Sequence, residues 1–133
     1  MNKLPAIATS ISTYLTLMDS IDDDSLTKMA VKNADSINES FYSEGVHSKN
    51  ALKLIFKTLE LSNILLYKIV EQDDAGACLI YIEKTIYPSR IMKLYFLEYI
   101  KYFCKLNRLS VEISGTEKKP IFRITTQNGG VFI

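Results

Sequence analysis

The sequence predicts an α+β protein in which two N-terminal helices precede an α/β half. Apolar residues recur every three or four positions up to Phe41, which is typical of amphipathic helices. Shorter apolar segments rich in β-branched and aromatic residues appear from Cys78 onward and indicate strands. The chain has 133 residues, 47% of them hydrophobic and 23% charged, which suits one globular domain with a sizeable core.

The first 44 residues predict an antiparallel helical hairpin. One apolar stripe follows the spacing of a coiled-coil seam, and Ile21 to Asp24 interrupt it, with Asp24 or Ser25 expected to cap the second helix. Two narrow stripes cannot bury each other fully, so we expect a second copy to complete a four-helix bundle, although the rest of the chain is an alternative cover. The expected dimer contacts are Leu4, Ile11, Leu15, Met18, Leu26, Met29 and Ile37.

The second part, residues 45–133, is predicted to alternate helices and strands. Gly45 suits the end of the second helix, and Ser48 or Asn50 suits the start of a third helix. Apolar residues from Leu52 to Val70 form a broad face, which predicts that this third helix is a core helix.

After a loop at 72–76, we expect a strand at 78–82. Pro88 favours the first turn of a fourth helix, which runs to about Leu106. Alternating residues at 109–114 predict a half-buried strand, and a turn at 115–120 leads to a paired strand at 121–125.

The overall charge and composition argue against several classes of partner. The net charge of +1 gives no long-range attraction to nucleic acid or to an anionic membrane. No apolar run is long enough for a membrane span, and residues 1–20 lack the apolar stretch of a signal peptide, so we expect a cytoplasmic protein. Cys78 and Cys104 lie among apolar residues and are expected to be buried free thiols, with a disulfide between them as the lesser alternative.

Few residues suggest chemistry of their own. His47 is the only histidine; an exposed position near a helix start is the simpler interpretation, and a phosphoacceptor role is the alternative. Asp22 to Asp24 are read as a capping loop rather than a metal site. The sequence has no zinc-ligand spacing and no phosphate-binding glycine loop, so we expect no metal and no cofactor.

A narrow basic ridge on the fourth helix is the remaining candidate surface. It is interpreted mainly as the solvated side of a core helix, with an acidic partner or a nucleic-acid backbone as the alternative. Neighbouring tyrosines at 81, 87, 95, 99 and 102 would suit base stacking, but their spacing places several of them in the core. The ridge comprises Arg90, Lys93, Lys101 and Lys105.

The order of these elements, together with several local segments, resembles the histidine-kinase core. Residues 2–18 align without a gap with the phosphoacceptor helix, which typically reads His-Glu-Leu-Arg-Thr-Pro-Leu-Thr-Ser-Ile. Residues 87–91, Tyr-Pro-Ser-Arg-Ile, are similar to the Asp-Pro-x-Arg-Leu that opens a kinase helix ending in Asn-Ala-Ile-Lys-Tyr, and 99–102 read Tyr-Ile-Lys-Tyr. Gln-Asn-Gly-Gly at 127–130 stands where kinases have Asp-Asn-Gly-x-Gly.

The resemblance implies a degenerate kinase-ATPase-like α/β sandwich behind a dimerising hairpin. The chemical residues differ: Asn2 stands at the phosphorylated histidine, Glu98 at the Mg²⁺-binding asparagine and Gln127 at the adenine-reading aspartate. The resemblance thus implies kinship with histidine phosphotransferases, in which receiver domains dock against the bundle. The corresponding docking residues are Asn2, Lys3, Pro5, Ile7 and Thr9.

The expected function is therefore a non-catalytic or weakly active phosphotransferase-like adaptor of two-component signalling. As a homodimer, it would bind a response-regulator receiver domain or a kinase. The alternative is a small inhibitor or immunity-type protein that blocks a partner enzyme or a nucleic-acid-guided complex by direct binding. An enzyme that uses His47 is the third and weakest hypothesis.

Overall fold

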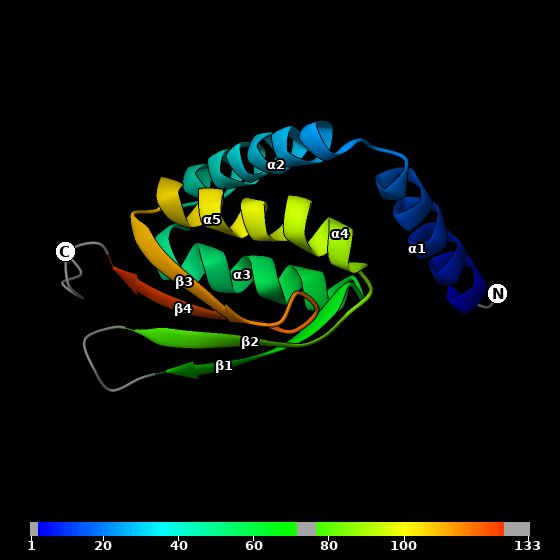
Figure 1. Cartoon of the computed structure of the whole chain (residues 1–133). Helices are drawn as coiled ribbons and strands as arrows, with labels where there is room; N and C mark the ends of the chain where they lie inside the picture. Colours follow the sequence, from blue (N-terminus) through cyan, green and yellow to red (C-terminus); the bar gives the residue numbers. More distant parts are fainter. Residues whose placement is uncertain (1–2, 72–76, 127–133) are drawn as a thin grey trace.

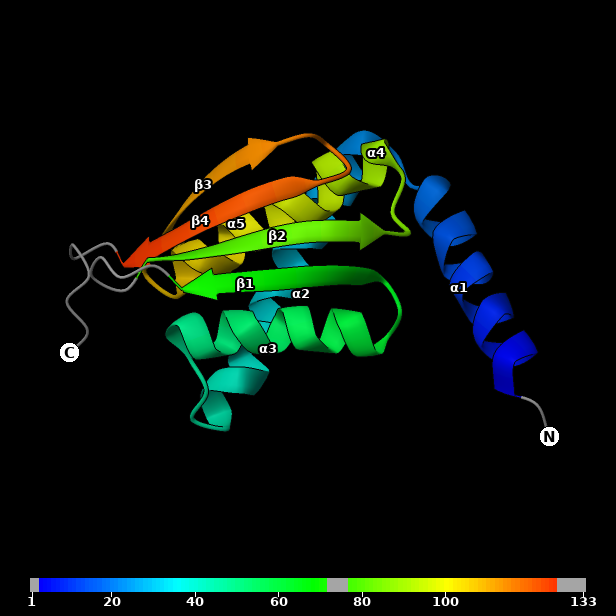
Figure 2. The ribbon, with the colours of Figure 1, turned by 90° about the horizontal axis from the view of Figure 1, so that it is seen from below.

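The computed structural model describes residues 3–71 and 77–126, with side chains described from Ile11 onward, and it confirms the α+β class. A four-stranded sheet carries one layer of helices, α2 lies outside that layer, and α1 leaves one end of the body (Figures 1 and 2). The helical elements are α1 (Lys3–Asp19), α2 (Asp23–Ser43), α3 (Ser48–Leu61), α4 (Ser89–Ile91), the π-helical segment η1 (Met92–Phe96) and α5 (Leu97–Leu106). The strands are β1 (Leu65–Glu71), β2 (Cys78–Thr85), β3 (Leu109–Gly115) and β4 (Pro120–Thr126).

Helix α2 has a well-defined cap at each end. Asp22 is its N-cap and accepts a hydrogen bond from the Ser25 amide at 2.8 Å, so the predicted caps, Asp24 and Ser25, lie inside the first turn instead. At the other end, Gly45 has a φ of +78° and its amide donates to the Tyr42 carbonyl, as predicted for a glycine that ends a helix. These caps fix both where α2 starts and the direction in which the chain leaves it.

The chain does not form the predicted antiparallel hairpin. Helix α1 diverges from α2 at the connection between them, and α2 packs instead on α5 and η1 (Figure 1). The buried face of α2 consists of Leu26, Ala30 and Ala34, whose small alanine side chains allow a close approach to α5. The apolar stripe that predicted a hairpin is therefore used to cover the chain's own fourth helix.

A single buried cluster also crosses the predicted boundary between residues 44 and 45. Leu26 and Ala30 of α2 belong to the same cluster as Phe56 of α3 and Phe103 of α5. Because no break in the core separates the two parts, α2 contributes to the stability of the α/β half.

The predicted third helix ends earlier than expected, and its second half is a strand. Helix α3 stops at Leu61, and Asn63 adopts a left-handed φ of +61° that turns the chain into β1. The residues from Leu65 to Glu71 then pair with β2, with Ile69 opposite Ile80. The prediction of a helix to Val70 was wrong because a continuous apolar run fits a buried helix and a strand equally well.

All strand pairs in the sheet are antiparallel, and the spatial order is β1-β2-β4-β3. The three strands predicted from the sequence are confirmed, and β1 is the additional one. The α4–η1–α5 helix crosses from β2 to β3 over the helix-covered face, and β4 lies between these two strands. Ile80, Phe122 and Ile124 point to this covered face and are fully buried.

The turn between β3 and β4 depends on Gly115. Its φ is +82°, and a Cβ atom built at this position would lie 2.5 Å from the Lys119 carbonyl oxygen. Gly45 has a similar φ but open space around it, so it is the matched control. We expect Gly45→Ala to cost about 1 kcal/mol and Gly115→Ala at least about 2 kcal/mol of unfolding free energy, measured by urea denaturation. Equal costs would contradict the steric argument.

Candidate functional site

The C-terminal turns of α1 are attached to the body at two places. Tyr14 and Tyr87 share a hydrogen bond of 2.6 Å between their hydroxyl oxygens, and the Met18 side chain is buried. On the other side, the Arg90 guanidinium donates to Asp23 at 2.9 Å and to the Ile21 carbonyl oxygen. Since Ile21 lies in the α1–α2 connection and Asp23 is the first residue of α2, Arg90 fixes the point from which α1 departs.

Four tyrosines surround a hollow of about 120 Å³ beside this attachment. The ring centroids of Tyr14 and Tyr87 are 6.1 Å apart, those of Tyr87 and Tyr95 6.3 Å, and those of Tyr95 and Tyr99 6.0 Å. Leu59, Ile64 and Phe96 complete the lining. We call this feature the tyrosine hollow.

The π-helical segment helps to place two of these rings. In η1 the Leu97 amide donates to the Met92 carbonyl oxygen, five residues earlier, which widens the helix locally. Tyr95 lies inside this segment, and Tyr99 follows one turn later on α5. Such π-helical turns occur frequently at functional sites, and this one lies directly at the hollow.

The phenols of the tyrosine hollow are neutral groups. Burial raises the pKa of Tyr87 far above its ordinary value, and burial likewise raises the pKa of Tyr95 and Tyr99. For Tyr14 burial also raises the pKa, against an opposing contribution from the hydrogen bond with Tyr87. Each hydroxyl therefore keeps its proton around neutral pH and can donate a hydrogen bond.

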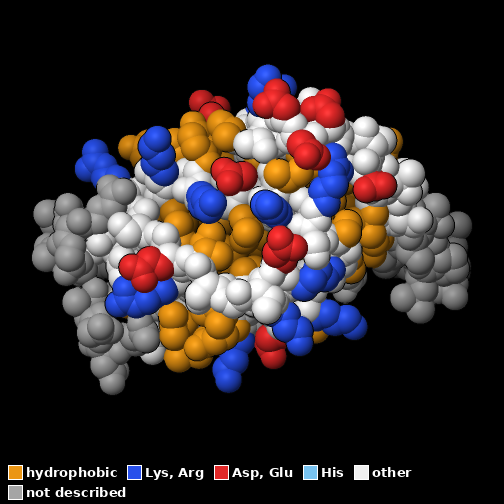
Figure 3. All heavy atoms as spheres, viewed as in Figure 1, with side chains coloured by type: hydrophobic (Ala, Val, Ile, Leu, Met, Phe, Trp, Pro, Cys, Tyr) orange, Lys and Arg blue, Asp and Glu red, His pale blue; other side chains and the backbone are white. Residues whose placement is uncertain are grey.

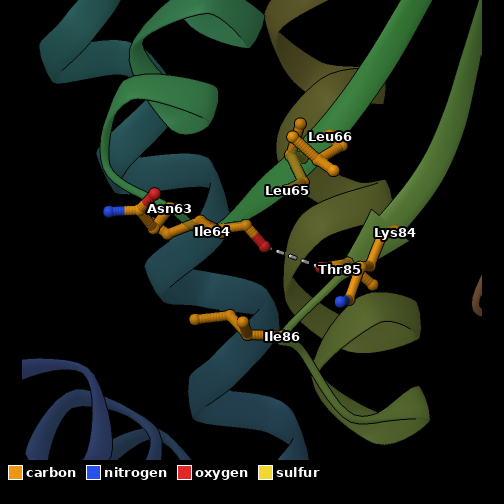
Figure 4. A pocket seen from close by; sticks show the side chains of 7 residues that line it. All are labelled: Asn63, Ile64, Leu65, Leu66, Lys84, Thr85 and Ile86. Carbon is orange, nitrogen blue, oxygen red and sulfur yellow. Dashed lines mark hydrogen bonds between the residues drawn. The ribbon is translucent and has the colours of Figure 1, made fainter. Parts of the chain in front are cut away.

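Further hollows adjoin the tyrosine hollow. One of about 180 Å³ shares Tyr14 and Ile64 with it and lies against Ile11 of α1. Another, of about 250 Å³, surrounds Ile64 and Lys84 at the end of the β1–β2 hairpin, where Thr85 Oγ1 donates to the Ile64 carbonyl oxygen (Figure 4). Apolar side chains also gather in the middle of the helical face, between charged ones (Figure 3).

The predicted docking residues lie at the N-terminal end of α1 and just before it. Asn2 lies outside the described residues, and Gln127 does as well. For Lys3, Pro5, Ile7 and Thr9 the structure gives their position in α1 but no side chains. Docking at these residues stays a prediction.

The predicted dimer contacts fall into two groups. Leu26 and Met18 are buried within their own chain, and Met29 and Ile37 pack partly against the same core. In α1, Ile11 and Leu15 are half-buried, and Leu4 is described without its side chain. Leu15 also packs partly against this core, so Ile11 is the one described side chain of the predicted seam that does not belong to it.

The basic ridge is interrupted by acidic neighbours. Arg90 pairs with Asp23 and lies 4.0 Å from Asp19, and Lys101 lies 3.4 Å from Glu98. Lys93 and Lys105 are exposed. This pattern fits the solvated side of a core helix better than a continuous positive surface for nucleic acid.

The remaining candidate residues are a histidine at the start of a helix and two cysteines in the core. His47 is the exposed N-cap residue of α3, with its ring centroid 6.4 Å from that of Tyr42. Cys78 and Cys104 are buried free thiols, as predicted. Among the described residues no group of three or more His, Cys, Asp or Glu could hold a metal ion, and no described helix is long and apolar enough to cross a bilayer.

Buried thiols predict a loss of stability in alkaline solution. Burial raises the pKa of Cys104 from 9.0 to about 12, and burial also raises the pKa of Cys78. The unfolded chain releases these protons from about pH 9 upward while the folded chain retains them, so the free energy of unfolding falls as the pH rises. We expect a loss of about 1 kcal/mol per pH unit for Cys104 above pH 9, from urea denaturation at several pH values. A Cys104→Ala variant with an unchanged slope would contradict this assignment.

Comparisons with known protein families, with curated proteins and with solved structures find no match to this chain.

Only part of the lining of the tyrosine hollow could be predicted from the sequence. The spacing of Tyr87, Tyr95 and Tyr99 predicted that several tyrosines point into the core, and the structure confirms this. Tyr14 was missed, because it lies beside the residues of the predicted seam and no local pattern relates it to Tyr87, which is 73 positions away. Tyr95 and Tyr99, four positions apart on one helix, are the signal from which a shared lining could have been inferred.

Proposed function

We propose that this chain is a non-catalytic adaptor that binds other proteins through α1 and pairs with a second copy of itself through the same helix. The observation that carries the proposal is the position of α1. Its C-terminal turns are fixed by Tyr14 and Arg90, while its N-terminal part extends away from the body (Figures 1 and 2). On an amphipathic helix held in this way, the N-terminal part of the apolar stripe, around Leu4 and Ile7, is left for a partner.

The amino acids of α1 support pairing between two copies. The stripe of Leu4, Ile7, Ile11 and Leu15 keeps the spacing of a coiled-coil seam, although Leu15 also packs partly on the core of its own chain. A two-fold pair of α1 helices would cover the stripes of both chains.

Helix α2 is less suited to the bundle that the sequence predicted. Its buried face lies on α5, and its outward residues Lys28, Lys32, Asp35 and Glu39 are exposed and charged. We therefore propose a dimer centred on α1, in place of a bundle in which α1 and α2 contribute equally.

The resemblance of the sequence to the histidine-kinase core supports a role in two-component signalling. A helix, two strands, a second long helix and two further strands follow α2, which is one strand more, β1, than the order from which the resemblance was drawn. We propose that a receiver domain or a kinase docks on the N-terminal part of α1, around Lys3, Pro5, Ile7 and Thr9. With Asn2 in place of the phosphoacceptor, binding rather than phosphate transfer is the proposed activity.

Light scattering of the full chain over a range of concentrations tests the proposal. We expect the wild-type chain to be a dimer and Ile11→Asp to be a monomer, because the new carboxylate lies in the apolar stripe. Thr13→Asp is the matched control: it adds the same charge at an exposed position of α1 and is expected to remain dimeric. Circular dichroism checks that both variants are folded.

A wild-type chain that is monomeric at all concentrations would overturn the paired adaptor. The inhibitor-type function would then take first place, with one copy of the chain binding its target directly. A dimer that Ile11→Asp leaves intact would show that a surface other than the α1 stripe pairs the two copies.

A further inference from the structure

The hydroxyl groups of the tyrosine hollow have more protons to donate than acceptors to receive them. Tyr95 accepts a hydrogen bond from the Asn33 amide at 2.9 Å, so its own proton is still available. Tyr14 and Tyr87 share one hydrogen bond, which uses the proton of one hydroxyl and leaves that of the other. Among the described residues, the Tyr99 hydroxyl has no hydrogen-bond partner.

The other lining residues cannot accept these protons. Leu59, Ile64 and Phe96 are apolar, and no carboxylate or amide side chain lines the hollow among the residues that the structure describes. Tyr87, Tyr95 and Phe96 are buried and form its floor, whereas Tyr14, Leu59, Ile64 and Tyr99 are half-buried and form its rim. The hollow therefore combines several hydroxyl donors with an apolar and aromatic wall, and its half-buried rim gives access from solvent.

Two adjoining hollows together give room for a single ring. Apolar cavities of about 150 Å³ in proteins admit a benzene ring. The tyrosine hollow alone, at about 120 Å³, is smaller than this, but it adjoins a hollow of about 180 Å³ that shares Tyr14 and Ile64. Small-ligand sites are typically of this composition, mostly apolar with a few convergent polar groups.

We propose that the tyrosine hollow binds a small aromatic ligand that carries an oxygen acceptor, of the phenolate class. The ring packs against Leu59, Ile64 and Phe96, and its oxygen accepts hydrogen bonds from the hydroxyls of Tyr95 and Tyr99. Hydrogen bonds to an oxyanion are charge-assisted and are roughly twice as strong as those between neutral groups. The site does not depend on the proposed pairing through α1.

Titration of the full-length wild-type chain with 4-nitrophenolate tests the proposal. The visible absorption of this probe changes when its oxygen is hydrogen-bonded, so one saturable transition is expected. Tyr99→Phe and Tyr95→Phe keep the rings and remove a donor, and each is expected to weaken binding about 10-fold or more. The matched control is Tyr102→Phe, which removes a hydroxyl of α5 that donates to Asp35 outside the hollow and is expected to bind as wild type.

A second ligand separates hydrogen bonding from simple apolar filling. We expect 4-nitrotoluene, which has a methyl group in place of the oxygen, to bind at least about 10-fold more weakly than 4-nitrophenolate. Its affinity is measured from its competition with 4-nitrophenolate. The proposal is overturned by the absence of saturable binding, by equal affinities for Tyr99→Phe and Tyr102→Phe, or by equally tight binding of 4-nitrotoluene. The wild-type comparison of the two ligands keeps the test decisive even if a Tyr→Phe variant does not fold.

Discussion

Replacing Phe56 by alanine is expected to lower the free energy of unfolding by about 3–5 kcal/mol. The Phe56 side chain is fully buried. Its ring centroid lies 5.5 Å from that of Tyr67 on β1, 6.1 Å from that of Phe96 on η1 and 5.9 Å from that of Phe122 on β4. Removing the ring leaves a cavity between α3 and these three elements, and the surrounding rings can close it only in part.

The loss is large compared with the whole stability of a domain of this size, which is typically about 5–15 kcal/mol. Urea denaturation followed by circular dichroism measures it. Leu54→Ala on the same helix is the matched control, because Leu54 is 40% exposed and its truncation is expected to cost less than about 1 kcal/mol. If Phe56→Ala cost no more than Leu54→Ala, the central position of Phe56 in the core would be refuted.

Replacing Leu26 by alanine is expected to cost about 2–5 kcal/mol and to shift the unfolding transition of the entire chain. Leu26 is fully buried on α2, in the same cluster as Phe103 of α5 and Ile124 of β4. Because these residues form one core, loss of the Leu26 methyl groups lowers the stability of α2 and of the α/β half together. A single cooperative transition at lower urea concentration is the expected result.

The control for this variant is Leu17→Ala. Leu17 lies on α1 and is 60% exposed, so its truncation is expected to change the unfolding free energy by less than about 1 kcal/mol. Two separate transitions, with only the first one shifted by Leu26→Ala, would indicate instead that the N-terminal helices form an independent unit.

The change from α3 to β1 marks one limit of what the sequence could predict. The apolar run from Ile64 to Val70 fits a helix face, and β1 becomes evident only through its pairing with β2, as in Ile69 opposite Ile80. This pairing is a contact between segments, which local periodicity does not contain. Asn63, which favours a left-handed helix end, was the one local signal that the helix stops there.

The second limit concerns which surface covers an apolar stripe. The stripe of α2 was correctly predicted to be buried, since Leu26 is buried and Met29 packs against the core. An apolar stripe predicts that the helix packs against another surface, but not whether that surface belongs to a second copy or to the chain itself. Here the fourth helix is also apolar on most sides, and α2 covers part of it, with the ring centroids of Phe41 and Phe103 6.4 Å apart.

The candidate site was the least predictable part of the molecule. The residues that line the tyrosine hollow come from different elements: Tyr14 lies on α1, Leu59 on α3, Ile64 between α3 and β1, and Tyr95 on η1. No local sequence pattern distinguishes any of these residues from its neighbours. Only the packing of α1 against the body brings their side chains together, and this packing depends on long-range contacts such as that between Tyr14 and Tyr87.

Hydrogen exchange of the full chain tests most directly the central claim that α2 is part of the core and α1 is the element left for partners. We predict that the amides of α2 exchange as slowly as those of α5, because both helices open only when the whole core opens. In dilute solution, where pairing is weakest, the amides of α1 are expected to exchange much faster than those of α2. If α1 and α2 exchanged together, and faster than α5, the two helices would form a separate hairpin, and the central claim would be contradicted.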